Sequence, residues 1–284
     1  MMKASALVLA IALIPHVTTA AAIQVPDTVV VRSGNLRLTA LLWRPEGRGP
    51  FPAVLFNHGS WPTNSPLVRP AREIFAQASV LGPVFARRGY VFLFLFRRGA
   101  GLSADQGVSA ADQLQRELEA HGEEARNRLR LRLLQTDELS DALAGLAYLR
   151  ALPEVDSRRV AIAGHSFGGA LTLLIAERDS SLAASVDFAG AAGGWESSPQ
   201  LRARLLSAVG VTTVPTFFIH AANDYSVAPG RALAAEMARV GRAYRLKIYP
   251  SFGTTASDAH NIVDLGVAVW EDDVFAFLTE RLRR

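Results

Sequence analysis

The strongest constraint on the fold is the alternation of short apolar runs with segments of helical length through the second half of the chain. An apolar run at 160–163 is followed directly by a helical pattern at 166–178. The alternation continues with expected strands at 185–189, 216–221 and 244–249, and with expected helices at 200–208, 230–240 and 265–284. Runs that are apolar on both faces and separated by helices are typical of parallel strands. The sequence therefore predicts an α/β fold with a mostly parallel central sheet covered by helices on both faces.

The first half of the chain adds four expected strands. Two of them, 28–32 and 36–43, are separated by turn residues and predict a hairpin. The third and fourth, 53–57 and 90–96, flank a helical pattern at 71–88. The parallel sheet therefore extends into this half of the chain, with the hairpin beside it.

A helical insertion is expected after the fourth strand. The chain between that strand and Val160 is much longer than one crossover helix requires, and the segment 136–152 supplies that helix. The remainder, 104–135, reads as a charged helix with interspersed leucines. It leaves the sheet at the edge where α/β proteins bind ligands, so it is either a lid over a site or a plain surface helix.

The N-terminus carries the pattern of a secretory signal peptide. Lys3 precedes an apolar run at 4–14, and small residues follow up to Ala22. We expect a signal peptide at 1–22, cleaved after Ala20 or Ala22, and an exported domain at 23–284, in the periplasm or the medium. The apolar run is too short to cross a bilayer, so no stable membrane span is expected after cleavage, although an uncleaved anchor is the alternative.

Composition narrows the chemistry. The chain has no cysteine, which excludes disulfides, thiolate metal sites and a cysteine nucleophile. It has a net charge of +4, and its arginine runs at 126–132 and 281–284 read as solvated helix faces, so no nucleic-acid partner is expected. No H-E-x-x-H pattern is present, and no metal site is expected.

Ser166 is the expected nucleophile. It is the central residue of Gly-His-Ser-Phe-Gly at 164–168, which follows the strand at 160–163 and opens the next helix. Because the chain contains 22 glycines, the pattern alone is weak, and its position gives it weight. Glycines at 164 and 168 are expected because larger side chains would collide across such a sharp turn. The alternative is a glycine-rich turn without chemistry.

His260 is the expected general base. A serine hydroxyl needs a histidine, and in this fold class the order along the chain is serine, acid, histidine. Two of the six histidines follow the elbow at 164–168. His220 lies within or just after a strand, whereas His260 lies in the polar loop 251–261 beyond the last strand. The alternative for His260 is a simple loop histidine.

Asp224 is the expected acid that orients the base. It follows the strand at 216–221 and so lies at the carboxyl edge of the sheet, where the serine turn also ends. Asp187 falls inside a strand, and Asp258 and Asp264 are so close to His260 in sequence that they are expected to cap or solvate its loop. The alternative for Asp224 is a turn aspartate.

Two backbone N–H groups are expected to form an oxyanion hole. One belongs to Phe167, directly after the serine, and the other to Ser60 or Trp61 in the loop after the third strand. Trp61, Trp195 and Tyr225, together with Phe167, are expected either to wall an apolar substrate pocket or to serve as packing.

Arg97 and Arg98 have two interpretations. Each could hold a substrate carboxylate. In a turn as rich in glycine as Gly99-Ala100-Gly101, a structural role in bonding carbonyl groups is favoured.

These motifs together resemble the dienelactone hydrolase and prolyl-oligopeptidase-like branch of the α/β-hydrolase superfamily. The resemblance covers about 28–284 and rests on His260 and on four motifs: GHSFGG at 164–169, NHGS at 57–60, FRRGAGLS at 96–103 and HAANDYSVAP at 220–229. It implies the α/β-hydrolase fold, a triad of Ser166, Asp224 and His260, and hydrolysis without a cofactor. Two features depart from it: dienelactone hydrolases proper use cysteine at the nucleophile position, and the chain has no room for a propeller.

The expected function is therefore that of a serine hydrolase that cleaves a carboxylic ester or lactone through an acyl-enzyme intermediate. Its expected partner is a small ester, lactone or short peptide-like substrate. The alternatives are a small exported peptidase of prolyl-oligopeptidase-like type and a non-catalytic binding protein on the same fold.

Overall fold

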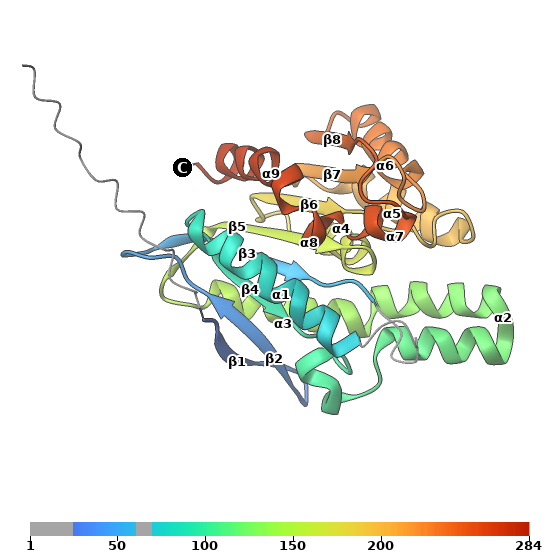
Figure 1. Ribbon diagram of the computed structural model, residues 1–284, viewed down its shortest axis with the longest axis horizontal. Coiled ribbons are helices and arrows are strands. Elements are labelled where there is room, and N and C mark those ends of the chain that lie inside the picture. Colours follow the sequence, from blue (N-terminus) through green and yellow to red (C-terminus); the bar gives the residue numbers. More distant parts are fainter. Residues whose placement is uncertain (1–24, 61–69, 284) are drawn as a thin grey trace, which may run out of the picture.

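One mixed sheet organises the chain. The computed structural model describes residues 25–60 and 70–283. In this part of the chain eight strands form a sheet of order β1-β2-β4-β3-β5-β6-β7-β8 (Figure 1). The β1–β2 and β2–β4 pairs are antiparallel, and the pairs from β4 through β3 to β8 are parallel. The strands are β1 (Asp27–Ser33), β2 (Leu36–Trp43), β3 (Phe51–Asn57), β4 (Val91–Leu95), β5 (Val155–His165), β6 (Ala184–Phe188), β7 (Thr216–Ala221) and β8 (Tyr244–Tyr249).

Helices cover both faces of this sheet, so the predicted α/β class is confirmed. The helices α1 and α9 pack on one face, and α3, α4, α5 and α6 pack on the other (Figure 1). Their bounds are α1 (Pro70–Arg87), α3 (Asp137–Arg150), α4 (Phe167–Arg178), α5 (Pro199–Val211), α6 (Ala228–Arg239) and α9 (Val267–Leu282). None of the helices within 25–60 and 70–283 is both long and apolar enough to cross a bilayer. The expected signal peptide at 1–22 lies outside the described residues.

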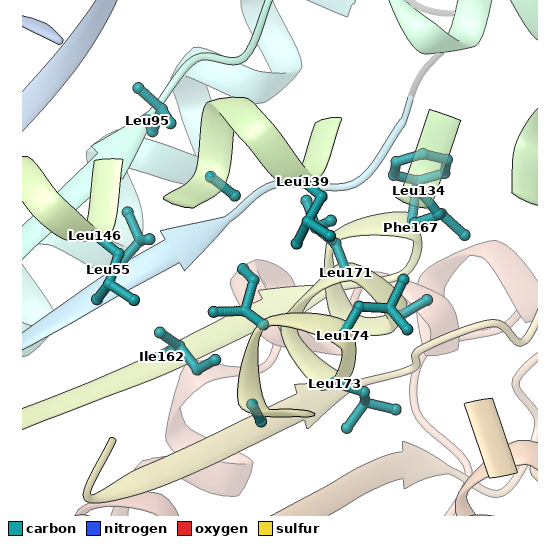
Figure 2. Packing of buried hydrophobic residues seen from close by; sticks show 14 of the residues in the cluster. Leu55, Leu95, Leu134, Leu139, Leu146, Ile162, Phe167, Leu171, Leu173 and Leu174 are labelled. Carbon is teal, nitrogen blue, oxygen red and sulfur yellow. The ribbon is translucent and has the colours of Figure 1, made fainter. Parts of the chain in front are cut away.

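The continuous apolar character of the strands follows from their position between two cores. In β4, Leu93 and Leu95 belong to the core under α3 and α4, while Phe92 and Phe94 belong to the core under α1 and α9. Successive side chains of a strand point to opposite faces, so a strand buried on both faces has no polar position. Figure 2 shows part of the first core, where Leu55 and Ile162 of the sheet lie among side chains of α3 and α4.

The insertion after β4 is a helical hairpin, which corrects the expectation of one charged helix over 104–135. A 3-10 turn, η1 (Gly101–Gln106), leads into α2 (Ala110–Gln135), whose first turn is capped by the Ser109 side chain. At Gly122 the backbone has φ 80°, a left-handed conformation that a helix interior cannot hold. The two halves of α2 therefore run antiparallel and extend away from the sheet edge (Figure 1).

The segment after β8 also differs from expectation. The predicted polar loop 251–261 contains a short helix, α7 (Ala256–His260), which begins with a capping box of Thr255 and Asp258. The predicted last helix, 265–284, corresponds to α9, and a break separates it from a further short helix, α8 (Ile262–Leu265). The break lies at Gly266, where φ is −121° and the backbone leaves helical geometry. His260 is consequently the last residue of a short helix rather than a residue of an open loop.

Candidate active site

Ser166 occupies a strained turn between β5 and α4. Its φ of 55° and ψ of −114° lie outside the regions that non-glycine residues normally adopt. A Cβ at Gly164 would lie 2.3 Å from the carbonyl oxygen of Gly168, and one at Gly168 would lie 2.0 Å from that of Asn57. A side chain at 164 would therefore collide across the turn, as predicted, whereas one at 168 would collide with the end of β3. The turn presents the serine hydroxyl at the carboxyl edge of the sheet.

The structure brings Ser166, His260 and Asp224 together from three distant segments. His260 Nε2 lies 2.9 Å from Ser166 Oγ, and His260 Nδ1 lies 2.8 Å from Asp224 Oδ1. The strands β5 and β7 are parallel members of one sheet, so the turns after them meet at the same edge. The helix α7 brings the imidazole between the hydroxyl and the carboxylate.

Asp224 is held as a carboxylate by its hydrogen bonds. Burial raises the pKa of this group, but hydrogen bonds from His220 and His260 outweigh burial and lower the pKa to about 2. Oδ1 also accepts the backbone N–H of Tyr225 at 2.7 Å. A negative charge therefore lies beside the imidazole of His260 at neutral pH.

His165 supports the backbone of His260. Its Nε2 donates to the carbonyl oxygen of His260 at 2.8 Å, and the two rings lie 4.9 Å apart. Burial lowers the pKa of His165 to about 3, so this ring stays neutral. His165 also lines the pocket that contains Ser166 and His260.

A pocket of about 370 Å³ opens above the nucleophile. Ser166 and His260 lie in its wall, and Gly59 and Ser60 of the loop after β3 line it as well. The apolar part of the wall comprises Leu134, Phe167, Ala170, Ala191 and Leu201. Leu134 of α2 and Phe167 of α4 also lie at one end of the core shown in Figure 2. The second half of α2 therefore contributes to the site.

A family assignment rests on residues 39–264, which match the model of the dienelactone hydrolase family. The chain belongs to the dienelactone hydrolase family. The matched region contains the elbow, the acid and the histidine, and members of this family are hydrolases. Hydrolase chemistry of the serine type is the activity that this membership supports.

Known relatives and structures agree with the fold. The chain is 29% identical over 175 residues to the quorum-quenching protein AidA of Acinetobacter baumannii, an alignment that covers 62% of this chain and 47% of AidA. The Pyrococcus horikoshii acylaminoacyl peptidase aligns with a TM-score of 0.63 at 18% identity, covering 91% of this chain and 41% of the peptidase. A Pyrococcus furiosus esterase aligns with a TM-score of 0.61 at 14% identity, covering 92% of each chain. The chain therefore spans about half the length, or less, of AidA and of the peptidase.

Arg97 and Arg98 both have structural roles, but only Arg97 bonds a carbonyl group as the structural interpretation expects, whereas Arg98 binds a carboxylate. Arg97 is 1% exposed, forms an ion pair with Glu138, and donates from Nη2 to the carbonyl oxygen of His58 at 2.8 Å. Arg98 binds both carboxylate oxygens of Asp141 at 2.7 and 2.9 Å. Through its ion pair with Glu138 and its hydrogen bond to His58, Arg97 anchors the loop that carries Gly59 and Ser60.

Arg130 is a cation in the pocket that the sequence analysis missed. It lies in the second half of α2 and donates from Nη1 to the Asn127 side chain at 2.6 Å. Burial, with a smaller contribution from Arg126, lowers its pKa to about 10. In the described part of the chain no carboxylate forms an ion pair with Arg130, whereas Arg126 and Arg128 are paired with Glu123 and Glu124. The arginine run at 126–132 is the only sequence signal for it, and spacing alone does not show which member points inward.

The remaining predicted site residues have different outcomes. Ser60 and Phe167 line the pocket, as does Tyr225, whose ring lies 4.9 Å from that of His260. Trp195 does not line it: this side chain is 5% exposed and packs in the core below α5, because burying its large apolar surface is favourable. Trp61 lies outside the described residues. In the described ranges no three His, Asp or Glu side chains are grouped as metal ligands would be.

Proposed function

We propose that this protein is a serine hydrolase that cleaves a carboxylic ester or lactone through an acyl-enzyme intermediate. One observation carries the proposal: the continuous hydrogen-bond chain from Ser166 Oγ through His260 to Asp224, with contacts of 2.9 and 2.8 Å. A nucleophile, a base within reach and a carboxylate that orients the base are the parts that acyl transfer needs.

In the proposed reaction, His260 Nε2 takes the proton of Ser166 as Oγ attacks the carbonyl carbon. The tetrahedral oxyanion accepts hydrogen bonds from the backbone N–H groups of Phe167 and Ser60. His260 then protonates the departing alcohol oxygen, and the acyl group remains on Ser166. A water molecule, deprotonated by His260, attacks the acyl-enzyme and releases the acid. Asp224 stays ionised throughout and stabilises the imidazolium.

The pocket favours an ester with a short apolar or negatively charged acyl group over a peptide with a free amino terminus. Binding a free ammonium group requires an acidic partner, and none of the described residues in the pocket wall is Asp or Glu. Arg130 instead contributes a positive charge that attracts a carboxylate and repels an amine. We also propose that the enzyme acts outside the cytoplasm, on the basis of the segment at 1–22.

The test is covalent labelling with a fluorophosphonate, together with hydrolysis of p-nitrophenyl butyrate. The wild-type protein is expected to be labelled once and to hydrolyse the ester, and Ser166→Ala is expected to lose both. The control is Ser251→Ala, at an exposed serine after β8, which keeps both.

Three results would contradict the proposal. Labelling that survives in Ser166→Ala places the nucleophile elsewhere. A wild-type protein that is neither labelled nor active supports a non-catalytic binding protein. Faster hydrolysis of aminoacyl or prolyl p-nitroanilides than of esters, by a factor of ten or more, supports the peptidase alternative.

A further inference from the structure

A second histidine contacts the acid of the proposed triad. His220 lies in β7, four residues before Asp224, and its Nδ1 is 2.9 Å from Asp224 Oδ2. Both side chains are 0% exposed. The other carboxylate oxygen, Oδ1, accepts from His260 and from the backbone N–H of Tyr225. Both oxygens of one buried carboxylate are therefore occupied, each by a different imidazole.

The surroundings of the His220 ring fix which nitrogen carries the proton. Its Nε2 is buried and has no hydrogen-bond partner in the described part of the chain. The helix α6 packs so closely there that a Cβ at Gly230 would lie 2.9 Å from Nε2. A protonated Nε2 would be a buried donor without an acceptor, which is costly. The contact with Asp224 is therefore made by a proton on Nδ1, which His220 donates to Oδ2.

The charged groups that face His220 are few. Asp224 faces Nδ1, and Asp187 of β6 lies on the same side of the sheet, because it pairs with Phe218, two residues before His220. The neighbouring position on β8 is Ile248, and α6 presents Gly230. An effect of His220 on the pH profile of activity therefore has to be distinguished from an effect of the nearby Asp187 carboxyl group on the same profile.

We propose that His220 is a positioning residue that holds the Asp224 carboxylate in the rotamer in which Oδ1 faces His260. This inference rests on the proposed function. Without the Nδ1–H donor, Oδ2 would be a buried, unpaired oxygen, and the carboxylate could rotate or bind a proton to relieve it. A carboxylate with fewer donors also attracts the proton of the His260 imidazolium more strongly. Either change in proton binding moves the acidic limb of the activity profile to higher pH, whereas rotation of the carboxylate lowers kcat.

The test compares three variants by their pH profiles of kcat and KM with p-nitrophenyl butyrate. His220→Leu removes the donor, and we expect kcat to fall by about tenfold to a hundredfold at an unchanged KM, because a hydrogen bond to a charged group is lost. We expect the acidic limb to move up by about one pH unit. His220→Asn places an amide N–H near the position of Nδ1 and is expected to restore both. Asp187→Asn is expected to leave the limb where it is in the wild type.

A purely structural role for His220 predicts a different outcome. His220→Leu would then have a lower melting temperature, but the folded protein would keep the wild-type kcat and acidic limb, and the proposal would be overturned. A folded His220→Asn protein whose kcat is as low as that of His220→Leu also overturns the proposal. So does an acidic limb that moves as far in Asp187→Asn as in His220→Leu.

A measurement on the wild-type protein guards against variants that do not fold. Nitrogen NMR of isotope-labelled histidine is expected to show a proton on Nδ1 of His220, and an Nδ1 without a proton overturns the proposal. This readout needs no catalysis. If the wild-type protein is inactive and unlabelled, the proposed function fails and the positioning role fails with it. If the wild type is active and His220→Leu equals it, only the positioning role fails.

Discussion

Replacing Asp187 with asparagine is expected to stabilise the protein in a strongly pH-dependent way. Asp187 is 1% exposed at the end of β6, and burial raises its pKa from 3.8 to about 7, although the nearby His220 opposes the shift. A carboxyl group with a raised folded-state pKa binds its proton more tightly in the folded than in the unfolded protein. Its favourable contribution is complete below pH 3.8 and is lost as pH rises through 7.

The size of the effect follows from the shift. A shift of three pKa units corresponds to about 4 kcal/mol of unfolding free energy. The wild-type protein has lost about 1.5 kcal/mol of this stabilisation at pH 5 and all of it well above pH 7. Asp187→Asn keeps the shape of the side chain but cannot ionise. We therefore expect the difference in unfolding free energy between the variant and the wild type to be about 2.5 kcal/mol larger at pH 9 than at pH 5, in favour of the variant.

Urea unfolding at both pH values measures this difference by linear extrapolation. Asp272→Asn is the control, because the Asp272 side chain is 91% exposed and its replacement is expected to have a similarly small effect at both pH values. If Asp187→Asn changes the unfolding free energy equally at pH 5 and pH 9, or stabilises more at pH 5, the reasoning from burial is wrong.

Two further predictions concern the elbow and the pocket. Gly168→Ala is expected to lower the unfolding free energy by about 2 kcal/mol or more and to reduce kcat, because its Cβ would press on the Asn57 backbone. The control is Gly210→Ala in α5, whose Cβ would meet only the end of the Glu236 side chain, at 3.2 Å. Thermal melts and ester assays in which the two variants behave alike would contradict the prediction. Arg130→Met is expected to raise KM about tenfold for p-nitrophenyl hemisuccinate and less than twofold for p-nitrophenyl butyrate. Equal changes in KM for the two esters would show that Arg130 does not bind the carboxylate.

Much of the candidate site was predictable because it depends on local pattern and chain order. The turn at Ser166 is encoded by flanking glycines between a strand and a helix, and the structure gives a steric reason for each glycine. His260 and Asp224 were selected by their order after the serine and by their position after strands. Parallel strands end at one edge, so this order is enough to predict that the three side chains meet.

Other features could not be read from local pattern. Trp195 was expected either at the pocket or in packing, and the local pattern did not decide between them; it packs in the core because the fold provides an apolar site for it. The segment 104–135 reads as one helix, whereas Gly122 turns it into a hairpin. Its second half then places Arg130 in the wall of the pocket that also contains Ser166. His220 was recognised only as a strand residue, since the sequence does not show which face of the sheet it points to.

The sequence by itself determined the sheet, the strained serine turn and the order of the three polar residues, because each depends on residues adjacent in the chain or on the rule that parallel strands share an edge. The tertiary structure decided which charges remain unpaired and which carboxylates share donors. Arg130, Asp187 and His220 have their properties from neighbours distant in sequence, because burial and hydrogen bonding, rather than residue type, set the chemistry of a polar side chain.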